Sequence, residues 1–543
     1  GQLYHDGKML PMARYPNEGF LSMDGGGADY FFDETKFTKE QLTGATVRIR
    51  PLNWIYQTRT ITGVSENKIM FDEPLFHTSR YQTTCNNGWG YYMENKKAFL
   101  DQHGEWYYDQ DQKKIILYLG ELPDDFSVEA SVTDDGIVIN PKTSHVKIEG
   151  LHISGYRNNG ITALGDNENI TIANCRFDSI YKMAIQGGLF CSGFTIKNNL
   201  FRDIYGRGIS FLETNNCRIE NNQMKRIGMI PGYGIDGLNG GIGILITSRE
   251  KSDKKQRKVS NNNYIGYNEI DSTGYISIRM DGYNSICEYN VASNALLTLN
   301  DGAMIYCWGK DPEFTHHNVI RNNIVSHAHG NTEGTPSDHK MNIGIYIDNR
   351  AHDIAVLNNV VHDAGSGIHV NDGSYNNILR GNVLYANRVG ISFAEFSKSN
   401  GVYCENNTCT QNIMFNTHNL KHTLSLKHTY APDFNPGIID SNLYVSPYEV
   451  YHLKKETMEE GCKIIKEHTF ESWTNKTVHD QNSRFVNAGP ESKSILLTNK
   501  NSKVKTFPLE NTMEYRDLHG NIVKKSVELQ PYGSKILMYS FTD

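Results

Sequence analysis

Titratable and aromatic side chains gather in one stretch of the chain, between Asp301 and Asp372. Asp301 opens the segment DGAMIYCWG, Asp348 closes NIGIYID, and Asp372 closes GSGIHVND. Eight of the 20 histidines lie between His316 and His369. General acid–base chemistry needs carboxyl or imidazole groups beside surroundings that shift their pKa, and aromatic rings supply such surroundings. This stretch is therefore the candidate site.

The bulk composition excludes several classes of function. The net charge is −7, from 54 basic and 61 acidic residues among 543, and no basic stripe typical of a nucleic-acid binder occurs. The one basic run, residues 251–258, contains an acid and is predicted to be an exposed loop. No apolar run approaches the roughly 18 residues of a membrane helix. The nine cysteines form no CxxC motif, so neither a zinc ribbon nor a thioredoxin-like centre is indicated. We expect no nucleic-acid partner and no membrane span, and the oligomeric state stays open.

A repeat with a period of about 22 to 26 residues begins near residue 140. Its units contain a short strand, a turn rich in asparagine, a second strand and then a Gly-Ile strand. Examples are residues 146–154, 170–178 and 194–202. Asparagine tolerates the left-handed backbone of a tight bend, and stacked asparagines can hydrogen-bond from coil to coil. The pattern predicts a right-handed parallel β-helix in an all-β protein.

The chain divides into three predicted domains around this repeat. Residues 1–140 hold strand-like runs without the repeat and are predicted to form a β-rich accessory domain. Residues 141–445 form the predicted β-helix with the catalytic groove. Residues 446–543 are predicted to hold the last coil elements and a terminal β-domain, with a short helical pattern in 450–470.

Alignment of the Gly-Ile strands predicts which side chains share one outward face. Residues at equal offsets on successive coils lie about 4.8 Å apart. Two residues after the aligned glycine position come Ser277, Tyr306, Tyr346, His369 and Ser392. Four residues after it come Thr247, Arg279, Trp308, Asp348, Asn371 and Ala394, and just beyond the strands come Asp281, Asp372 and Glu395.

Aromatic rings beside carboxylates favour a sugar-binding groove. Ring faces pack on the apolar faces of a pyranose, and carboxylates accept hydroxyl hydrogen bonds or act as acid and base. A single outward Asp or Asn in such a fold is more often a turn former than a functional group. The shared offset of Arg279, Trp308 and Asp348 favours a functional cluster instead.

The motifs Asp301–Gly309 and Gly344–Asp348 resemble paired motifs of secreted bacterial β-helix glycoside hydrolases. The nearest groups are the β-helical α-L-fucosidase/xylanase family and the β-helical β-xylosidase family. Residues 8–17, 104–109 and 529–537 are also similar. The resemblance implies a secreted or periplasmic protein, although the chain contains no signal peptide. It also implies that early coils, which usually precede the 8–17 motif, are absent here or supplied in another way.

The resemblance assigns roles to individual residues. Asp348 matches the probable nucleophile or general base, and Asp301 matches the Asp that opens the other motif. The xylosidase-like group has a Glu as acid/base about one coil later, where this chain has Asn371 followed by Asp372. The partner of Asp348 therefore stays open between Asp301 and Asp372. The residues expected to contact substrate are Arg279, Asp281, Tyr306, Trp308, Tyr346, His369 and Glu395.

Three functions are compatible with these residues. The leading hypothesis is a glycoside hydrolase that acts on a complex plant, algal or host polysaccharide and needs no cofactor. A polysaccharide lyase would use Arg279 or His369 as base and a calcium ion, held by the group of carboxylates, to neutralise a uronate. A non-catalytic glycan-binding β-helix is the third. The spacing of the histidines matches no metal-ligand motif, so no metal site is predicted.

Overall fold

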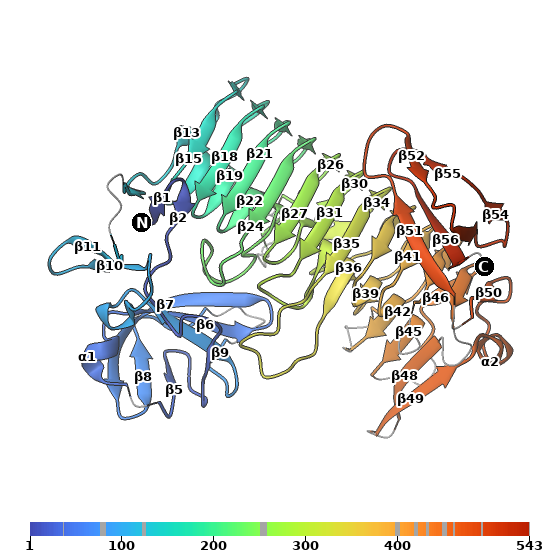
Figure 1. Ribbon diagram of the computed structural model, residues 1–543, viewed down its shortest axis with the longest axis horizontal. Helices are drawn as coiled ribbons and strands as arrows, with labels where there is room; N and C mark the ends of the chain where they lie inside the picture. Colours follow the sequence, from blue (N-terminus) through green and yellow to red (C-terminus); the bar gives the residue numbers. More distant parts are fainter. Residues whose placement is uncertain are drawn as a thin grey trace.

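Three long parallel sheets wind around a common axis and form the body of the molecule (Figure 1). The computed structural model describes residues 1–541 except 36, 77–82, 122–125, 250–257, 397–401, 418–421, 430–433, 448–452, 460–461 and 490–491. The predicted basic loop at 251–258 lies almost entirely outside the described residues. Each coil contributes one strand to each sheet, in the same chain order, and this confirms the predicted parallel β-helix.

Sheet 1 carries the candidate site. Among the described residues it has thirteen strands. They are β13 (Ile137–Ile139), β16 (Asn159–Ala163), β19 (Met183–Leu189), β22 (Arg207–Leu212), β25 (Ile244–Thr247), β28 (Ile278–Met280), β32 (Gly302–Trp308), β36 (Asn342–Asp348), β39 (Ser366–Asn371), β42 (Val389–Glu395), β45 (His422–His428), β48 (Leu453–Glu459) and β49 (Cys462–His468).

Sheets 2 and 3 complete the coils. Sheet 2 consists of β14 (Lys147–Glu149), β17 (Thr171–Ala173), β20 (Thr195–Lys197), β23 (Arg218–Glu220), β26 (Tyr264–Gly266), β30 (Ile286–Glu288), β34 (Val319–Arg321), β37 (Ala355–Leu357), β40 (Ile378–Arg380), β43 (Asn407–Thr410) and β46 (Gly437–Asp440). Sheet 3 consists of β15 (His152–Ser154), β18 (Arg176–Ile180), β21 (Leu200–Ile204), β24 (Gln223–Ile227), β27 (Glu269–Thr273), β31 (Val291–Ala295), β35 (Ile324–Ala328), β38 (Val360–His362), β41 (Val383–Tyr385), β44 (Ile413–Phe415), β47 (Leu443–Ser446) and β50 (Arg484–Asn487). A two-stranded pair, β29 (Gly282–Tyr283) and β33 (Thr315–His316), lies at the corner between sheets 1 and 2.

A column of buried asparagines fixes the stacking of the coils between sheets 2 and 3. Asn323 is representative. Its Oδ1 accepts one hydrogen bond from the backbone N–H of Asn290 at 2.9 Å and another from the Nδ2 of Asn290 at 3.0 Å. The Nδ2 of Asn323 in turn donates to Cys287 O and to Asn359 Oδ1. Each buried amide thus satisfies its own polar atoms by binding the neighbouring coils, as predicted. The same contacts recur from Asn199 to Asn442.

The interior is filled by stacked apolar side chains that are mostly isoleucine and phenylalanine. Phe177 and Phe201, on consecutive coils, stack with ring centroids 4.9 Å apart and planes 5° apart. Small residues are needed where the strands of sheet 1 bend. At Gly344 an added Cβ would lie 2.6 Å from the carbonyl oxygen of Gly367 on the next coil and 2.2 Å from Val361. This crowding explains the Gly-Ile signature of the repeat.

The N-terminal domain is an antiparallel sheet that packs beside the first coils (Figure 1, blue). Its strands are β3 (Arg14–Tyr15), β4 (Leu21–Ser22), β5 (Tyr30–Phe32), β6 (Thr46–Leu52), β7 (Ile55–Ser65), β8 (Lys68–Phe71) and β9 (Gly90–Glu94), with helix α1 (Lys39–Leu42). The smaller pairs are β1 (Leu3–His5) with β2 (Lys8–Met9) and β12 (Glu129–Ala130), and β10 (Trp106–Asp109) with β11 (Lys114–Leu117).

Buried polar contacts tie this domain to two loops of the β-helix. The fully buried Arg50 donates to Asn331 and to the carbonyl of Glu333. Tyr56 donates to the carbonyl of Thr298 at 2.8 Å. Because a buried guanidinium is costly to leave unpaired, these bonds hold the loop at 328–341 against the accessory sheet.

The C-terminal strands form a separate small β-structure against the last coils (Figure 1, red). They are β51 (Lys493–Thr498), β52 (Lys505–Pro508), β53 (Met513–Arg516), β54 (Ile522–Val523), β55 (Ser526–Leu529) and β56 (Ser534–Phe541). The helical pattern expected in 450–470 was wrong. β48 and β49 form an antiparallel hairpin there, because β48 continues the parallel ladder of β45, and helix α2 (Phe470–Lys476) begins only afterwards.

The asparagine column predicts a large cost for a single substitution. Asn323→Ala removes the acceptor of two N–H groups of Asn290 and a donor to Cys287 O, all of them buried. Unsatisfied buried polar groups cost about 1–3 kcal/mol each, so we expect a loss of about 2–4 kcal/mol in the free energy of unfolding. Urea denaturation followed by fluorescence measures it. The control Gln223→Ala, on an exposed strand position, should lose much less, and equal losses would contradict the assignment.

Candidate functional site

Two carboxyl groups from consecutive strands of sheet 1 form the centre of the site. Asp348 ends β36, and its Oδ2 accepts a hydrogen bond from the phenol of Tyr306 at 2.7 Å. Its Oδ1 accepts from Asn371 Nδ2 at 2.9 Å. Asp301, immediately before β32, lies close enough to interact electrostatically with Asp348. The charge of Asp348 therefore acts on Asp301, although the two residues lie at opposite ends of the paired strands β36 and β32.

The two carboxyls have different surroundings. Burial and the neighbouring Asp348 raise the pKa of Asp301 to about 7. Among the described residues, none donates a hydrogen bond to the Asp301 carboxyl. Burial also raises the pKa of Asp348, but the hydrogen bonds from Asn371 and Tyr306 oppose that rise. Donors stabilise an ionised carboxylate, so the surroundings of Asp348 favour ionisation more than those of Asp301 do, and Asp301 is the group whose surroundings favour its proton.

Backbone contacts hold Asp301 in place. Its φ is +55°, a left-handed conformation that Asp adopts more readily than most residues. The Tyr275 hydroxyl donates to the Asp301 carbonyl at 2.7 Å. The preceding Asn300 donates its backbone N–H to the carbonyl of Asn53 in the N-terminal domain at 3.0 Å. The accessory domain thus braces the turn that presents the acid.

The register of the predicted ladder is confirmed from Tyr306 to Ser392, and its side chains are buried. The register pairs Tyr306 with Tyr346, Tyr346 with His369, and His369 with Ser392. The Tyr306 and Tyr346 rings meet edge to face with centroids 5.3 Å apart. Trp308 pairs with Asp348 on the second predicted row. These side chains line the strand face next to the acid pair.

The predicted row of Arg279 was wrong by two residues. Arg279 pairs with Tyr306, not with Trp308, and Ser277 occupies the position that Gly243 holds in the preceding coil. The guanidinium lies 5.2 Å from the centroid of Tyr306 and 5.7 Å from that of Trp308. Arg279 therefore stays beside the aromatic face although it shares no rung with Asp348.

Asp281 is fully buried and has structural partners. Its Oδ1 accepts from the backbone N–H of Trp308, and its Oδ2 accepts from Arg279 and Thr247. Burial alone would lower the pKa of Arg279, but Asp281, together with Tyr306 and Tyr275, raises it. The position of Asp281 indicates that it orients Arg279 rather than meeting a ligand itself.

Asp372 and Glu395 form a separate pair at the corner that follows the strands. Burial and a hydrogen bond with Asp372 raise the pKa of Glu395 to about 8. The fully buried Glu395 also accepts from the backbone N–H groups of Gly373 and Cys404. Asp372 has a φ of +43°. These contacts associate Asp372 with Glu395 and with the turn, whereas Asp301 is the acid that interacts with Asp348.

His369 is buried next to the aromatic face. Its Nδ1 lies 2.6 Å from the hydroxyl oxygen of Ser392, and its ring centroid is 5.0 Å from that of Tyr346. Burial lowers the pKa of His369 to about 4. The imidazole is therefore neutral at pH 7.

A hollow of about 590 Å³ adjoins the site on the earlier coils of sheet 1. Its lining includes Arg207, Ser210, Leu238, Asn239 and Leu245. It connects to the ladder because Arg279 Nη1 donates to Asn239 Oδ1 at 2.8 Å. Sequence reasoning missed Arg207 and Asn239. Arg207 directly precedes the Gly-Ile segment of its coil, so a charged residue at this aligned position could have identified it from sequence. Asn239 lies in an insertion, and the repeat alignment does not place residues of insertions.

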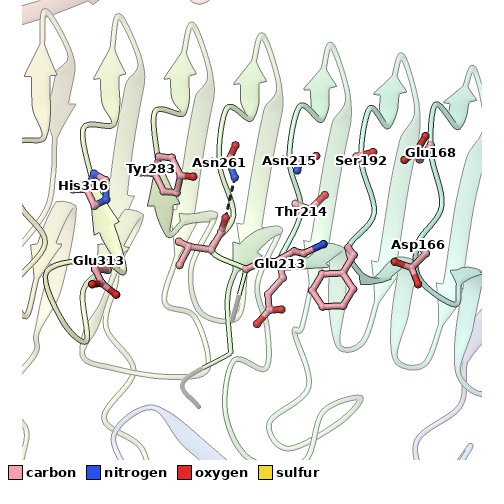
Figure 2. Close-up of a pocket in the computed structure, with 13 residues that line it drawn as sticks. Asp166, Glu168, Ser192, Glu213, Thr214, Asn215, Asn261, Tyr283, Glu313 and His316 are labelled. Carbon is pink, nitrogen blue, oxygen red and sulfur yellow. Dashed lines mark hydrogen bonds between the residues drawn. The ribbon is translucent and has the colours of Figure 1, made fainter. Parts of the chain in front are cut away.

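A second hollow, of about 580 Å³, lies at the corner between sheets 1 and 2 (Figure 2). One polar side chain per coil forms its floor, in the order Glu168, Ser192, Asn215, Asn261 and Tyr283. Glu213, which also lines it, accepts two hydrogen bonds from Arg249 at 2.7 Å. This hollow contains none of the residues predicted for the site.

One group of possible metal ligands occurs among the described residues. His327, His362 and Asp363 place their ligand atoms within 4.8 Å of one another on sheet 3 and the turn after it. Calcium prefers six to eight oxygen ligands, and this group offers one carboxylate with two imidazoles. Its ligand set therefore does not match that of a calcium site. It also lies on a different sheet from Asp301 and Asp348.

Comparisons with known proteins support the fold. The sequence matches the family model for a right handed beta helix region over residues 125–250. No curated protein matches it. A solved structure named a glycoside hydrolase aligns with a TM-score of 0.52 over 70% of this chain and 75% of that one, at 16% identity. The chain has the right-handed β-helix fold.

Two further solved structures align with lower TM-scores. A mutant of a periplasmic alginate epimerase aligns with a TM-score of 0.35 at 13% identity, over 55% of this chain and 65% of that one. An alginate lyase from a Paenibacillus species aligns with a TM-score of 0.31 at 14% identity, over 57% and 90%. None of the helices in the described part of the chain is long and apolar enough to cross a membrane.

The raised pKa of Asp301 has a consequence for stability that can be measured. An aspartate in an unfolded chain has a pKa of about 3.9. Between about pH 4 and pH 7 the folded protein holds a proton that the unfolded chain releases, so stability falls as pH rises. Asp301→Asn lacks this titration. We expect the variant to be more stable than wild type at pH 8 and nearly equal to it at pH 4.5.

Urea unfolding at the two pH values checks this prediction. Glu121→Gln, at an exposed position, is the matched control and should leave the pH dependence of stability unchanged. A variant Asp301→Asn with the same pH dependence as wild type would show that Asp301 is ionised in the folded protein.

Proposed function

We propose that the protein is a glycoside hydrolase that cleaves a complex polysaccharide, with Asp301 and Asp348 as its acid–base pair. The observation that carries the proposal is the raised pKa of Asp301, about 7, beside an Asp348 that receives two hydrogen bonds. Glycoside hydrolysis requires one protonated carboxyl and one ionised carboxylate at the scissile bond.

In the proposed reaction Asp301 donates its proton to the glycosidic oxygen as the bond to the anomeric carbon breaks. Asp348 either removes a proton from the attacking water or attacks the anomeric carbon itself, and water then releases the sugar. Both routes consume one water and need no cofactor. Tyr306 and Asn371 hold Asp348, and Tyr346 and Trp308 supply a partly apolar wall for the sugar ring.

The fold is consistent with this proposal. The β-helix exposes one face along many coils, which suits an extended oligo- or polysaccharide, and a solved protein with similar coils is named a glycoside hydrolase. The resemblance of the Asp301 and Asp348 motifs to secreted β-helix glycoside hydrolases adds the assignment of the two acids. We propose from the same resemblance that the protein acts outside the cytoplasm.

A polysaccharide lyase is the second candidate, and the neutral His369 favours it. Burial lowers the pKa of His369 to about 4, so an unprotonated imidazole lies against Tyr346 at pH 7. Such a base could remove the C5 proton of a uronate while Arg279 pairs with the carboxylate. The bond to the leaving oxygen then breaks, and a double bond forms in the sugar.

Replacement of either proposed acid should abolish hydrolysis. Asp348→Asn and Asp301→Asn should each lower kcat/KM by at least about 10²-fold, because proton transfer by a positioned group contributes this much. Reducing-end release from a panel of plant, algal and host glycans measures the rate, and circular dichroism confirms folding. Asp203→Asn, on sheet 3, is the control.

Other variants separate the alternatives. Asp372→Asn should keep most of the activity. If Asp372→Asn were inactive and Asp301→Asn active, Asp372 would be the catalytic partner of Asp348. A product that absorbs in the ultraviolet, lost in His369→Ala and kept in Asp348→Asn, would instead establish a lyase.

The pH profile provides an independent test. Because the proposed acid must be protonated, kcat/KM should fall as pH rises above about 7, where Asp301 loses its proton. Initial rates between pH 4 and 9 on the best glycan of the panel measure it. Activity that keeps rising beyond pH 8 would contradict the role of Asp301 as the acid.

A further inference from the structure

Arg207 is a cation in the hollow beside the acid pair, and its protein contacts are all uncharged. Its Nε donates to the Asn239 carbonyl at 2.7 Å, one terminal nitrogen donates to the Leu238 carbonyl at 3.1 Å, and the other to the Ser210 hydroxyl at 3.2 Å. A guanidinium has five N–H groups in one plane. Three are used, and among the described residues no partner takes the remaining two, one on each terminal nitrogen.

The charges around the hollow do not compensate Arg207. Its lining includes one carboxylate, Asp236, which forms an ion pair with Arg59 at 3.1 Å and accepts the backbone N–H of Thr58 at 2.7 Å. Arg279 is neutralised by Asp281 at 2.8 Å. Burial and the nearby Arg279 lower the pKa of Arg207 to about 10, so it stays charged at pH 7. Among the described residues that line the hollow, one positive charge is left without a carboxylate partner.

The hollow and the acid pair share a continuous chain of contacts. Asn239 accepts from Arg207 through its carbonyl and from Arg279 through its side chain. Arg279 stacks on Tyr306, and Tyr306 donates to Asp348. Arg207 lies on β22, three coils before β32, which is on the order of 14 Å at the usual strand spacing. A bound chain of several sugar units spans that length.

We propose that the hollow at Arg207 is a subsite for an anionic sugar, so that the substrate is an acidic polysaccharide carrying a uronate carboxylate or a sulfate ester. The two free N–H groups point to bidentate binding of a planar or tetrahedral oxyanion, which an arginine fork matches. The apolar part of the lining, with Leu238 and Leu245, suits the C–H face of the same sugar ring. The inference rests on the proposed function, because it places the subsite in the same substrate path.

The alternative is that Arg207 only braces the loop that carries Leu238 and Asn239. A brace would stabilise the free protein, whereas an uncompensated cation kept for a ligand would not. Arg207→Gln removes the charge and keeps an amide that can still donate. We expect its melting temperature to equal or exceed that of wild type without ligand.

Calorimetric titration of the full chain tests ligand preference directly. The probes are oligogalacturonate, oligoalginate and a glucuronate-rich oligosaccharide, each with its carboxyl-reduced neutral counterpart, and a sulfated galactan oligosaccharide with its desulfated counterpart. We expect wild type to bind at least one anionic probe about tenfold or more tightly than its neutral counterpart, since a charged hydrogen bond contributes this much. The pair that shows the preference distinguishes carboxylate from sulfate.

Variants assign that preference to Arg207. In Arg207→Gln the two members of the preferred pair should bind alike, and Arg207→Lys should keep part of the preference because it retains charge without the fork. Arg202→Gln, at an exposed position on sheet 3, is the matched control and should bind as wild type does. Equal binding of both members in every pair by wild type, or an equal loss for both members together with a lower melting temperature in Arg207→Gln, would overturn the proposal.

These outcomes are separate from those of the hydrolase proposal. Binding of the anionic probe requires no cleavage, so an anion preference with an unaltered Asp348→Asn activity would overturn the hydrolase and leave the subsite. Hydrolysis of neutral glycans alone, without any preference for anionic probes, would overturn the anionic subsite and leave the hydrolase proposal.

Discussion

The parallel register between coils is the constraint on which the rest of the structure depends. Each asparagine of the buried column hydrogen-bonds to the coil on either side, so a coil cannot shift by one residue without leaving several buried polar atoms unsatisfied. The same register decides which side chain of sheet 1 faces outward and which neighbour it meets. The contact between Tyr306 and Asp348 is therefore set by hydrogen bonds on the far side of the coil.

The acid pair illustrates how a repeating scaffold produces a site that does not repeat. Asp348 lies at the end of one strand and Asp301 before the start of the preceding one, so the two carboxyls are not rung neighbours. The turn that presents Asp301 has a left-handed backbone and is held by Tyr275 and by the N-terminal domain through Asn53. The accessory sheet therefore helps to fix the turn that carries Asp301.

Much of the fold could be predicted from sequence because the repeat is local. Asparagine and Gly-Ile positions recur at a fixed spacing, and the ladder from Tyr306 through Tyr346 to His369 followed directly from them. The predicted row of Arg279 was wrong because its coil lacks the glycine that marks the alignment. Ser277 stands at that position instead. The hairpin of β48 and β49 was missed because the repeat is no longer recognisable after about residue 445, although β48 still pairs in parallel with β45.

The site was less accessible to sequence reasoning than the fold. Aligned positions identified Asp348 and its aromatic neighbours, but they could not place Asp301, which lies in the turn before the first residue of β32. They also could not find Asn239, because its loop follows no repeat and takes its position from contacts with Arg207 and Arg279. Insertions contribute groups whose location depends on tertiary contacts alone.

The regular spacing of the coils sets the distances between groups along the axis of the β-helix. Arg207 and the acid pair are separated by whole coils, so their separation along the axis changes only in steps of about 4.8 Å when a coil is gained or lost. Duplication of one repeat between β22 and β32 would move the cation relative to the reacting groups while leaving every local contact of each intact. A solenoid can therefore change the separation between two groups on different coils without any change in the local contacts of either group.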